Sequence, residues 1–184
     1  LKEMAKHFEL VIFTASLSKY ANPLMDILDP ERLCTGRLFR EHCCFLEQEK
    51  IYTKDMSLLG RRIEDVILLD NSLHSYRPQP ENAVPILSWY DDPDDRELYK
   101  LTPLLTNLAR VPDVRAVLGR VHENHVMDLA KAEKLTLKIL RKLNQPKRKK
   151  QVHFAPSLDL RDDLQLSMIE EEDLPSTPNT RSIR

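Results

Sequence analysis

Val66-Ile67-Leu68-Leu69-Asp70-Asn71-Ser72 decides the fold class, together with Val11-Ile12-Phe13-Thr14-Ala15-Ser16 upstream. Each stretch is an apolar run that ends abruptly in small polar residues, as in a buried parallel strand whose carboxyl end opens into a site. Strand-like and helical stretches alternate along residues 1–118, so we predict an α/β fold with a doubly wound, mainly parallel sheet. Ligands of such sheets bind outside the carboxyl ends of the strands.

Shorter elements are predicted around those strands from their hydrophobic periodicity. The helical segments are 18–28, 94–108 and 113–143, and the strand segments are 37–45, 50–53 and 83–88. Pro23 predicts a break or a restart of the first helix near Asn22, because proline has no backbone N–H to donate. The strands 37–45 and 50–53 are predicted to form a small β-hairpin inserted beside the sheet.

Composition divides the chain into a main domain at 1–118, a helical extension at 119–145 and a disordered tail at 146–184. The tail is rich in Ser, Asp and Pro, and it buries too little apolar surface to offset the entropy of ordering it. The 28 basic and 29 acidic residues nearly balance, and we expect no direct contact with nucleic acid. Three cysteines, of which Cys43 and Cys44 are adjacent, indicate a reducing, intracellular compartment.

Polar residues at the ends of the strand-like stretches are candidates for a site, and each has a simpler explanation. The Thr14 hydroxyl could donate to a phosphoryl oxygen, or it could cap the helix predicted from Ser18. Lys54 could neutralise an anion, or it could be a solvated surface charge. Asp70 and Asn71 offer the carboxylate and amide oxygens that Mg²⁺ prefers, or they could form an ordinary turn after a strand. Taken singly, none of these residues decides the function.

The order of several short motifs is more specific than any one of them. The motifs are Phe13-Thr14-Ala15-Ser16, Arg37-Leu38-Phe39-Arg40-Glu41, Lys54-Asp55, Leu69-Asp70-Asn71-Ser72, Asn82-Ala83-Val84-Pro85-Ile86 and Ser88-Trp89-Tyr90. In this order they closely resemble the small phosphatases that act on the C-terminal domain of RNA polymerase II and their relatives. This is the NLI-interacting-factor-like family within the haloacid dehalogenase superfamily, and the resemblance covers residues 1–118.

The resemblance implies a Mg²⁺-dependent serine/threonine protein phosphatase that forms an aspartyl-phosphate intermediate. In that family, an Asp-x-Asp-x-Thr signature at the end of the first strand supplies the nucleophile and the acid/base. This sequence has no such signature before Phe8 and no later one in the right context, which implies a domain truncated at its N-terminus, without that strand. The missing strand would lie between the strands that end at Thr14 and Asp70. We expect residues 1–184 alone to be marginally stable and inactive.

Carried over residue by residue, the resemblance also implies roles for single side chains. The phosphate-binding residues would be Thr14 and Lys54, the metal ligands Asn71 and Asp70, and the substrate-groove residues Leu17, Tyr20 and Arg40. The sequence departs from the family at Leu73, where proline is usual after Asp-Asn-Ser, and at the hairpin tip 46–50, which lacks the usual glycine. These departures bear on the metal loop and on the choice of peptide.

The tail carries a second signal. Lys150-Gln151-Val152-His153-Phe154 fits the docking pattern of protein phosphatase-1 regulators, in which an extended segment adds to a sheet edge while Val152 and Phe154 fill apolar pockets. The basic run 147–150 could be a nuclear-import signal, could bind anionic surfaces or could keep a linker solvated. We expect a nuclear protein, and a membrane-anchoring segment upstream of Leu1 stays open.

Three functions are therefore weighed. The leading one is the phosphoprotein phosphatase. The second is a non-catalytic peptide-binding module on the same fold, as in a relative in the mitochondrial inner-membrane translocase. The third is a scaffold that docks protein phosphatase-1 through its tail. Retention of Thr14, Lys54, Asp70 and Asn71 favours the enzyme, because a peptide holder needs neither phosphate-binding nor metal-binding groups.

Overall fold

The computed structural model describes residues 1–123 and 126–144. The chain divides into two compact units, Leu1–Pro146 and Lys147–Arg184, and the second unit lies outside the described residues. The predicted tail, 146–184, therefore stays a prediction.

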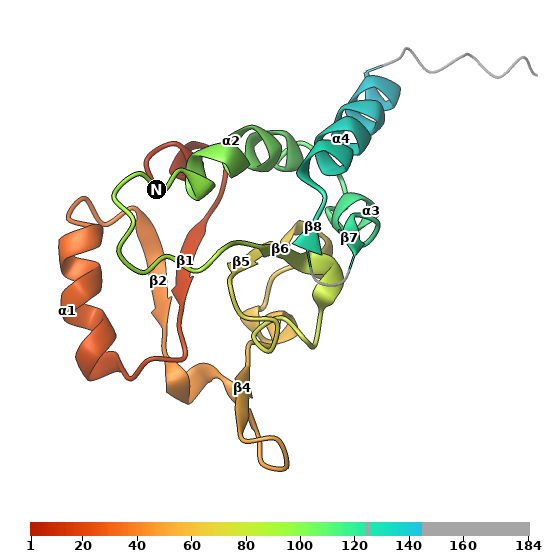
Figure 1. Cartoon of the computed structure of the whole chain (residues 1–184). Coiled ribbons are helices and arrows are strands. Elements are labelled where there is room, and N and C mark those ends of the chain that lie inside the picture. Colours follow the sequence, from red (N-terminus) through yellow and green to blue (C-terminus); the bar gives the residue numbers. More distant parts are fainter. Residues whose placement is uncertain (124–125, 145–184) are drawn as a thin grey trace, which may run out of the picture. The chain divides into compact units, whose positions relative to one another are not determined.

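The first unit is a mixed α/β structure, as the sequence predicts (Figure 1). Its helices are α1 Ser18–Leu28, α2 Glu97–Leu108, α3 Arg115–Leu118 and α4 Leu129–Leu143. Its strands are β1 Leu10–Phe13, β2 Cys34–Leu38, β3 Cys44–Leu46, β4 Ile51–Thr53, β5 Leu68–Asp70, β6 Ala83–Pro85, β7 His122–Glu123 and β8 Val126–Met127. Short 3-10 helices are η1 Met4–Lys6, η2 Arg40–His42, η3 Met56–Leu59, η4 Ile63–Asp65 and η5 Pro80–Asn82.

The strands pair two by two into four sheets. β1 lies parallel to β2, and β5 lies parallel to β6, so the parallel pairing predicted from the sequence is confirmed. β3 and β4 form the predicted antiparallel hairpin, and β7 pairs antiparallel with β8. Within the described residues, β1 and β5 therefore each have a partner on one edge only.

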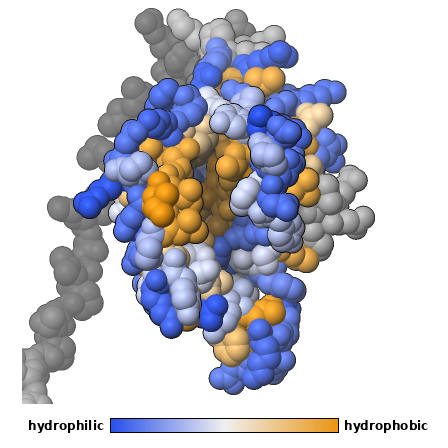
Figure 2. Space-filling model, turned by 60° about the vertical axis from the view of Figure 1, so that its left-hand side comes forward, coloured by the Kyte–Doolittle hydropathy of each residue, from blue (hydrophilic) through white to orange (hydrophobic). Residues whose placement is uncertain are grey.

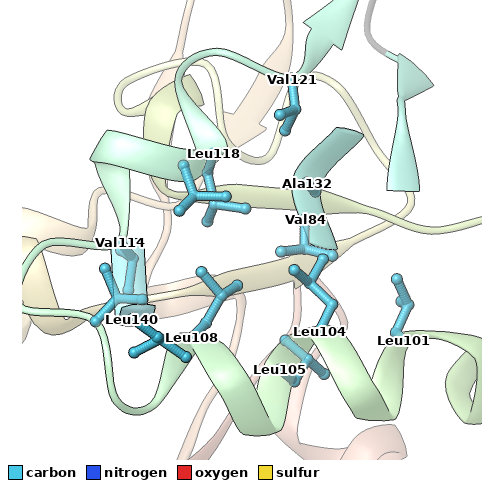
Figure 3. Close-up of a cluster of buried hydrophobic side chains, with 12 residues drawn as sticks. Val84, Leu101, Leu104, Leu105, Leu108, Val114, Leu118, Val121, Ala132 and Leu140 are labelled. Carbon is cyan, nitrogen blue, oxygen red and sulfur yellow. The ribbon is translucent and has the colours of Figure 1, made fainter. Parts of the chain in front are cut away.

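The main hydrophobic core lies between β6 and helices α2, α3 and α4 (Figure 3). Helix α2 contributes Leu101, Leu104, Leu105 and Leu108, whose spacing puts them on one face of a 3.6-residue helix. Helix α4 packs against α2 and buries residues one turn apart, Ala132, Thr136 and Leu140. The extension predicted at 119–145 thus shares the core of the main domain.

The β1–β2–α1 half is packed less completely. Helix α1 buries only Ala21, while Leu24 and Ile27 of the same helix are 53% and 76% exposed. Val11 on β1 is 42% exposed, although strands of a parallel sheet are usually buried on both faces. Figure 2, which turns this side forward, shows apolar residues around a hollow with hydrophilic residues at its rim. The unpaired edge of β1 therefore coincides with incomplete burial of its side chains.

Helix α1 runs through Pro23 without the break or restart predicted near Asn22. Proline at this position removes the N–H that would bond to the carbonyl of Lys19. Lys19 is exposed near the start of the helix, so water can reach its carbonyl group. The cost of the missing bond is thereby reduced, and the helix continues to Leu28.

Two other predicted elements are each divided in the structure. The strand predicted at 37–45 becomes β2 and β3, separated by η2, because the backbone N–H of Arg40 donates to Ser16 O instead of continuing a ladder. The helical pattern 113–143 becomes α3 and α4, with β7 and β8 between them. The Asp128 carboxylate accepts the N–H of Lys131 and so caps a new helix start.

None of the helices in residues 1–123 and 126–144 is both long and apolar enough to span a bilayer.

Candidate functional site

A buried ion pair joins the ends of β4 and β5. Lys54 follows β4 directly, and its ammonium group contacts Oδ2 of Asp70, the last residue of β5. The side chains of Lys54 and Asp70 are only 8% and 7% exposed. Asp70 Oδ1 also accepts the N–H of Ser72 at 2.8 Å, and the N–H of Lys54 donates to Ser75 O at 2.7 Å. The Asp70 carboxylate is therefore fixed by a backbone contact as well as by Lys54, and the backbone of Lys54 is anchored to Ser75.

The end of β1 lies beside this ion pair. The Lys54 ammonium is 5.6 Å from the centre of the Phe13 ring, and Thr14 follows Phe13 in the chain. The N–H of Thr14 donates to Leu38 O, which extends the β1–β2 ladder by one bond. The structure thus brings the carboxyl ends of β1, β4 and β5 together around Lys54.

The Thr14 hydroxyl takes part in a local turn. Its Oγ1 accepts the N–H of Ser16 at 3.1 Å, while the N-cap residue of α1 is Leu17 and has no side-chain cap. The alternative in which Thr14 caps this helix is therefore wrong. Since the hydroxyl oxygen only accepts in this turn, its proton can be donated to another group.

Asn71 and Asp70 offer oxygen atoms at the end of β5. The Asn71 side-chain N–H donates to Ser88 Oγ at 2.8 Å, which leaves the amide oxygen to act as a ligand. Carboxylate and amide oxygens suit Mg²⁺, which keeps several of its waters in proteins. Across residues 1–123 and 126–144, no three His, Cys, Asp or Glu side chains gather closely enough to hold a metal. These two residues therefore fit part of a magnesium site, and water, phosphate or further residues would have to supply the rest.

The candidate substrate residues lie on η2 and at the start of α1. Arg40 donates from Nε to Ala15 O at 2.6 Å, which ties it to the loop after Thr14. Leu17 and Tyr20 are 37% and 68% exposed. Arg40 thus lies next to the β1 end, and the two α1 residues present apolar surface to solvent. Val152 and Phe154 of the candidate docking motif lie outside the described residues.

The structure adds residues to the site that the sequence analysis did not single out. The Sγ atom of Cys43 lies 3.9 Å from the carbonyl oxygen of Thr14, and burial raises the pKa of the Cys43 thiol. Tyr76 is 3% exposed, and burial, followed by the negative charge of Asp70, raises the pKa of its hydroxyl. The Tyr52 ring lies under the Arg40 guanidinium, 5.2 Å from it. Nothing in the residue pattern marks Cys43 or Tyr76, whereas alternation along the hairpin could have placed Tyr52.

Asp55 holds the segment after Lys54 in place, which leads to a prediction about pH. Its carboxylate accepts from Ser57 N, Ser57 Oγ and Gln79 Nε2 at 3.0, 2.6 and 2.7 Å. The Ser57 and Gln79 side-chain hydrogen bonds lower the pKa of Asp55 below its ordinary value of 3.8. We expect Asp55→Ala to cost about 1 kcal/mol of unfolding free energy at neutral pH.

The sign of this pH dependence follows from the lowered pKa. The stabilisation by Asp55 is present above pH 3.8 and is lost as the pH falls through the lower folded value. Urea unfolding of the chain and of the Asp55→Ala variant should therefore show a difference at pH 7 that shrinks towards pH 3. A difference that is constant, or that grows on acidification, would contradict this account.

Comparison with known proteins gives one family and several relatives. The model of the "NLI interacting factor-like phosphatase" family matches residues 1–115. A "Probable C-terminal domain small phosphatase" of Dictyostelium discoideum is 52% identical over 124 residues, which cover 67% of this chain and 40% of the relative. The human "CTD small phosphatase-like protein" is 49% identical over 121 residues, or 66% of this chain and 43% of the relative.

A third relative is the human "Carboxy-terminal domain RNA polymerase II polypeptide A small phosphatase 1". It is 49% identical over 118 residues, which cover 64% of this chain and 44% of the relative. The match with each of these three relatives thus spans less than half of the relative's length.

Proposed function

Because this chain belongs to the NLI interacting factor-like phosphatase family, we propose that it contains the phosphate-binding part of a phosphoserine/phosphothreonine protein phosphatase. The observation that carries the proposal is the buried Lys54–Asp70 pair at the ends of β4 and β5. Removing two charges from water is costly, and apolar residues in their place would often be as stable or more so. A functional need for a fixed ammonium group explains the pair better than stability does.

Lys54 and Thr14 would hold the phosphate group. An ammonium on a rigid strand end stabilises the charge of a transferring phosphoryl group without having to reorganise. Asp70 fixes this ammonium through the ion pair, and the Thr14 hydroxyl has a proton to donate. We assign Mg²⁺ to Asn71 and Asp70, where it would neutralise further negative charge on the phosphate.

We propose that a further strand bearing Asp-x-Asp-x-Thr completes the site between β1 and β5. Within the described residues β1 pairs only with β2, and β5 only with β6, so each has an edge available for another strand. The exposed side chain of Val11 on β1 supports a further neighbour, because residues 1–123 and 126–144 do not cover it fully. With that strand the two parallel pairs would become one doubly wound sheet of the haloacid dehalogenase type, and its aspartates would act as nucleophile and acid/base.

The non-catalytic alternative fits the site less well. A module that only holds extended peptides has no use for a buried ammonium–carboxylate pair, which is expensive to bury. The name of one relative refers to the carboxy-terminal domain of RNA polymerase II, and we propose a nuclear phosphoprotein as the substrate here. Docking of protein phosphatase-1 through Lys150–Phe154 is a separate proposal about the tail.

Phosphate-dependent binding of a peptide tests the proposal. We expect the chain to bind a fluorescently labelled phosphoserine peptide more tightly than the unphosphorylated peptide, measured by fluorescence anisotropy. Thr14→Val should weaken binding of the phosphopeptide about tenfold, because it removes a hydrogen bond to a charged group while keeping the shape of the side chain. Thr14→Ser keeps the hydroxyl and should retain the preference. Equal affinity of the unaltered chain for both peptides would overturn the proposal.

A further inference from the structure

We propose that Tyr52 is a positioning residue for Arg40, and that the β3–β4 hairpin aims the Arg40 guanidinium at the phosphorylated substrate. This inference rests on the proposed function, because it takes an anionic substrate at the end of β1 as its starting point. It goes further by giving the hairpin a task in recognition. The contacts of Arg40 and of the hairpin aromatic residues carry the argument.

Arg40 is held at three points. Its backbone N–H donates to Ser16 O at 3.1 Å, and its side-chain Nε donates to Ala15 O at 2.6 Å. The central carbon of its guanidinium lies 5.2 Å from the centre of the Tyr52 ring, within the range of a cation–π contact. The Ala15 carbonyl and the Tyr52 ring therefore hold the side chain, while the Ser16 carbonyl holds the backbone of Arg40.

Tyr52 is itself supported across the hairpin. Phe45 is its direct partner in the β3–β4 register, and the two ring centres are 4.8 Å apart. Lys50, near the hairpin tip, lies 5.9 Å from the Phe45 ring. Arg40, Tyr52, Phe45 and Lys50 thus form a row in which two aromatic rings, tilted by 40° to one another, lie between two cations. Because cross-strand aromatic pairs stabilise a hairpin, the Tyr52 ring is a firm surface for Arg40.

The contacts of Arg40 leave one end of its guanidinium available. Nε donates to Ala15 O, and the guanidinium carbon lies over the Tyr52 ring. Nη1 and Nη2 make no hydrogen bond or ion pair among residues 1–123 and 126–144. Those two groups are the fork that binds phosphate or carboxylate oxygens in pairs. An arginine already held in one orientation loses less conformational entropy when it binds an anion. Tyr52 would therefore increase affinity for a phosphorylated substrate without touching it.

The test separates the ring's electrostatic role from its shape. Tyr52→Leu keeps apolar bulk but has no π face. Replacement of Tyr52 by pentafluorophenylalanine keeps an aromatic ring but reverses its quadrupole. Tyr52→Phe keeps the ring and the sign of its quadrupole. We expect Tyr52→Leu and the fluorinated variant to weaken binding of a phosphoserine peptide about threefold, with Tyr52→Phe unchanged. Binding of the unphosphorylated peptide should not change. Tyr99→Leu, which removes a 75% exposed tyrosine from α2, is the matched control.

Two further measurements make each outcome decisive. In a chain that already carries Arg40→Gln, the substitution Tyr52→Leu should no longer change the affinity for the phosphoserine peptide, because the ring then has no cation to hold. Hydrogen exchange of the Arg40 Nε–H, followed by NMR, should speed up in Tyr52→Leu and stay slow in Tyr52→Phe. If this exchange rate is the same in all variants, Tyr52 does not position Arg40 and the inference is wrong. If exchange responds but Arg40→Gln does not affect phosphopeptide binding, the substrate role of Arg40 fails while the positioning contact stands.

Discussion

Replacing Asp70 with asparagine is expected to lower the free energy of unfolding by about 3–5 kcal/mol, because Lys54 is left with an uncompensated buried charge. Asparagine has almost the size of aspartate, so the loss would come from electrostatics and not from a cavity. A natural domain has only about 5–15 kcal/mol of stability in total. The substitution should therefore remove a large share of the stability of the chain.

Circular dichroism during urea unfolding measures this loss, and two variants serve as controls. Asp113→Asn breaks a more exposed pair, Asp113–Arg115, and should cost no more than about 1 kcal/mol. The double variant Lys54→Met/Asp70→Leu removes both buried charges and should regain most of the stability lost in Asp70→Asn. Equal small losses from Asp70→Asn and Asp113→Asn would show that Lys54 and Asp70 are not an energetically important buried pair.

The double variant also separates stability from function. If Lys54 is retained for phosphate binding, a stable chain without it should show no preference for a phosphopeptide. The buried pair then illustrates a general relation: a charge that is costly to bury is kept where a ligand needs it preorganised. If the double variant keeps the fold, the loss of binding is attributable to the missing Lys54–Asp70 pair and not to unfolding.

The sequence predicted the parts of this fold that depend on local pattern. Apolar runs that end in polar residues located β1 and β5, and periodicity located α1 and α2. These signals work because one period puts side chains on one face of a helix, and a buried parallel strand is apolar throughout. The proximity of Lys54 and Asp70 was expected from the resemblance to the family; it does not follow from pairing within one sheet, because Lys54 follows β4 of the antiparallel hairpin and Asp70 ends β5 of a parallel pair.

The remaining features depend on contacts between distant segments. The split of 113–143 into α3 and α4 depends on the Asp128 cap and on a hairpin of two-residue strands, which is too short to give an alternating pattern. The position of Tyr52 under Arg40 depends on η2, which changes the direction of the chain between β2 and β3. Periodicity contains no information on such turns. Residues with a tertiary role in the site were therefore missed even where the strand carrying them was predicted.

Residues 1–184 are expected to show no metal-dependent hydrolysis of a phosphate ester, since the sequence contains no Asp-x-Asp-x-Thr signature in the right context. Holding a phosphate group beside Lys54 positions it, but no covalent step follows without a carboxylate to attack phosphorus. In a serine protease, which also works through a covalent intermediate, removing the nucleophile costs about 10⁶-fold in rate. A loss of this size would leave only the small acceleration that positioning and charge stabilisation supply without a nucleophile.

Fusing an apolar strand that ends in Asp-x-Asp-x-Thr to the amino end of the chain should create activity towards p-nitrophenyl phosphate with Mg²⁺. The strand would pair with the free edges of β1 and β5, so the same fusion should raise the unfolding midpoint in urea. A fusion with the first aspartate replaced by asparagine should gain the stability but not the activity. Turnover by the unextended chain would contradict the proposed nucleophile. A fusion that gains neither stability nor activity would contradict the placement of a strand between β1 and β5, because strand pairing and catalysis are expected from the same insertion.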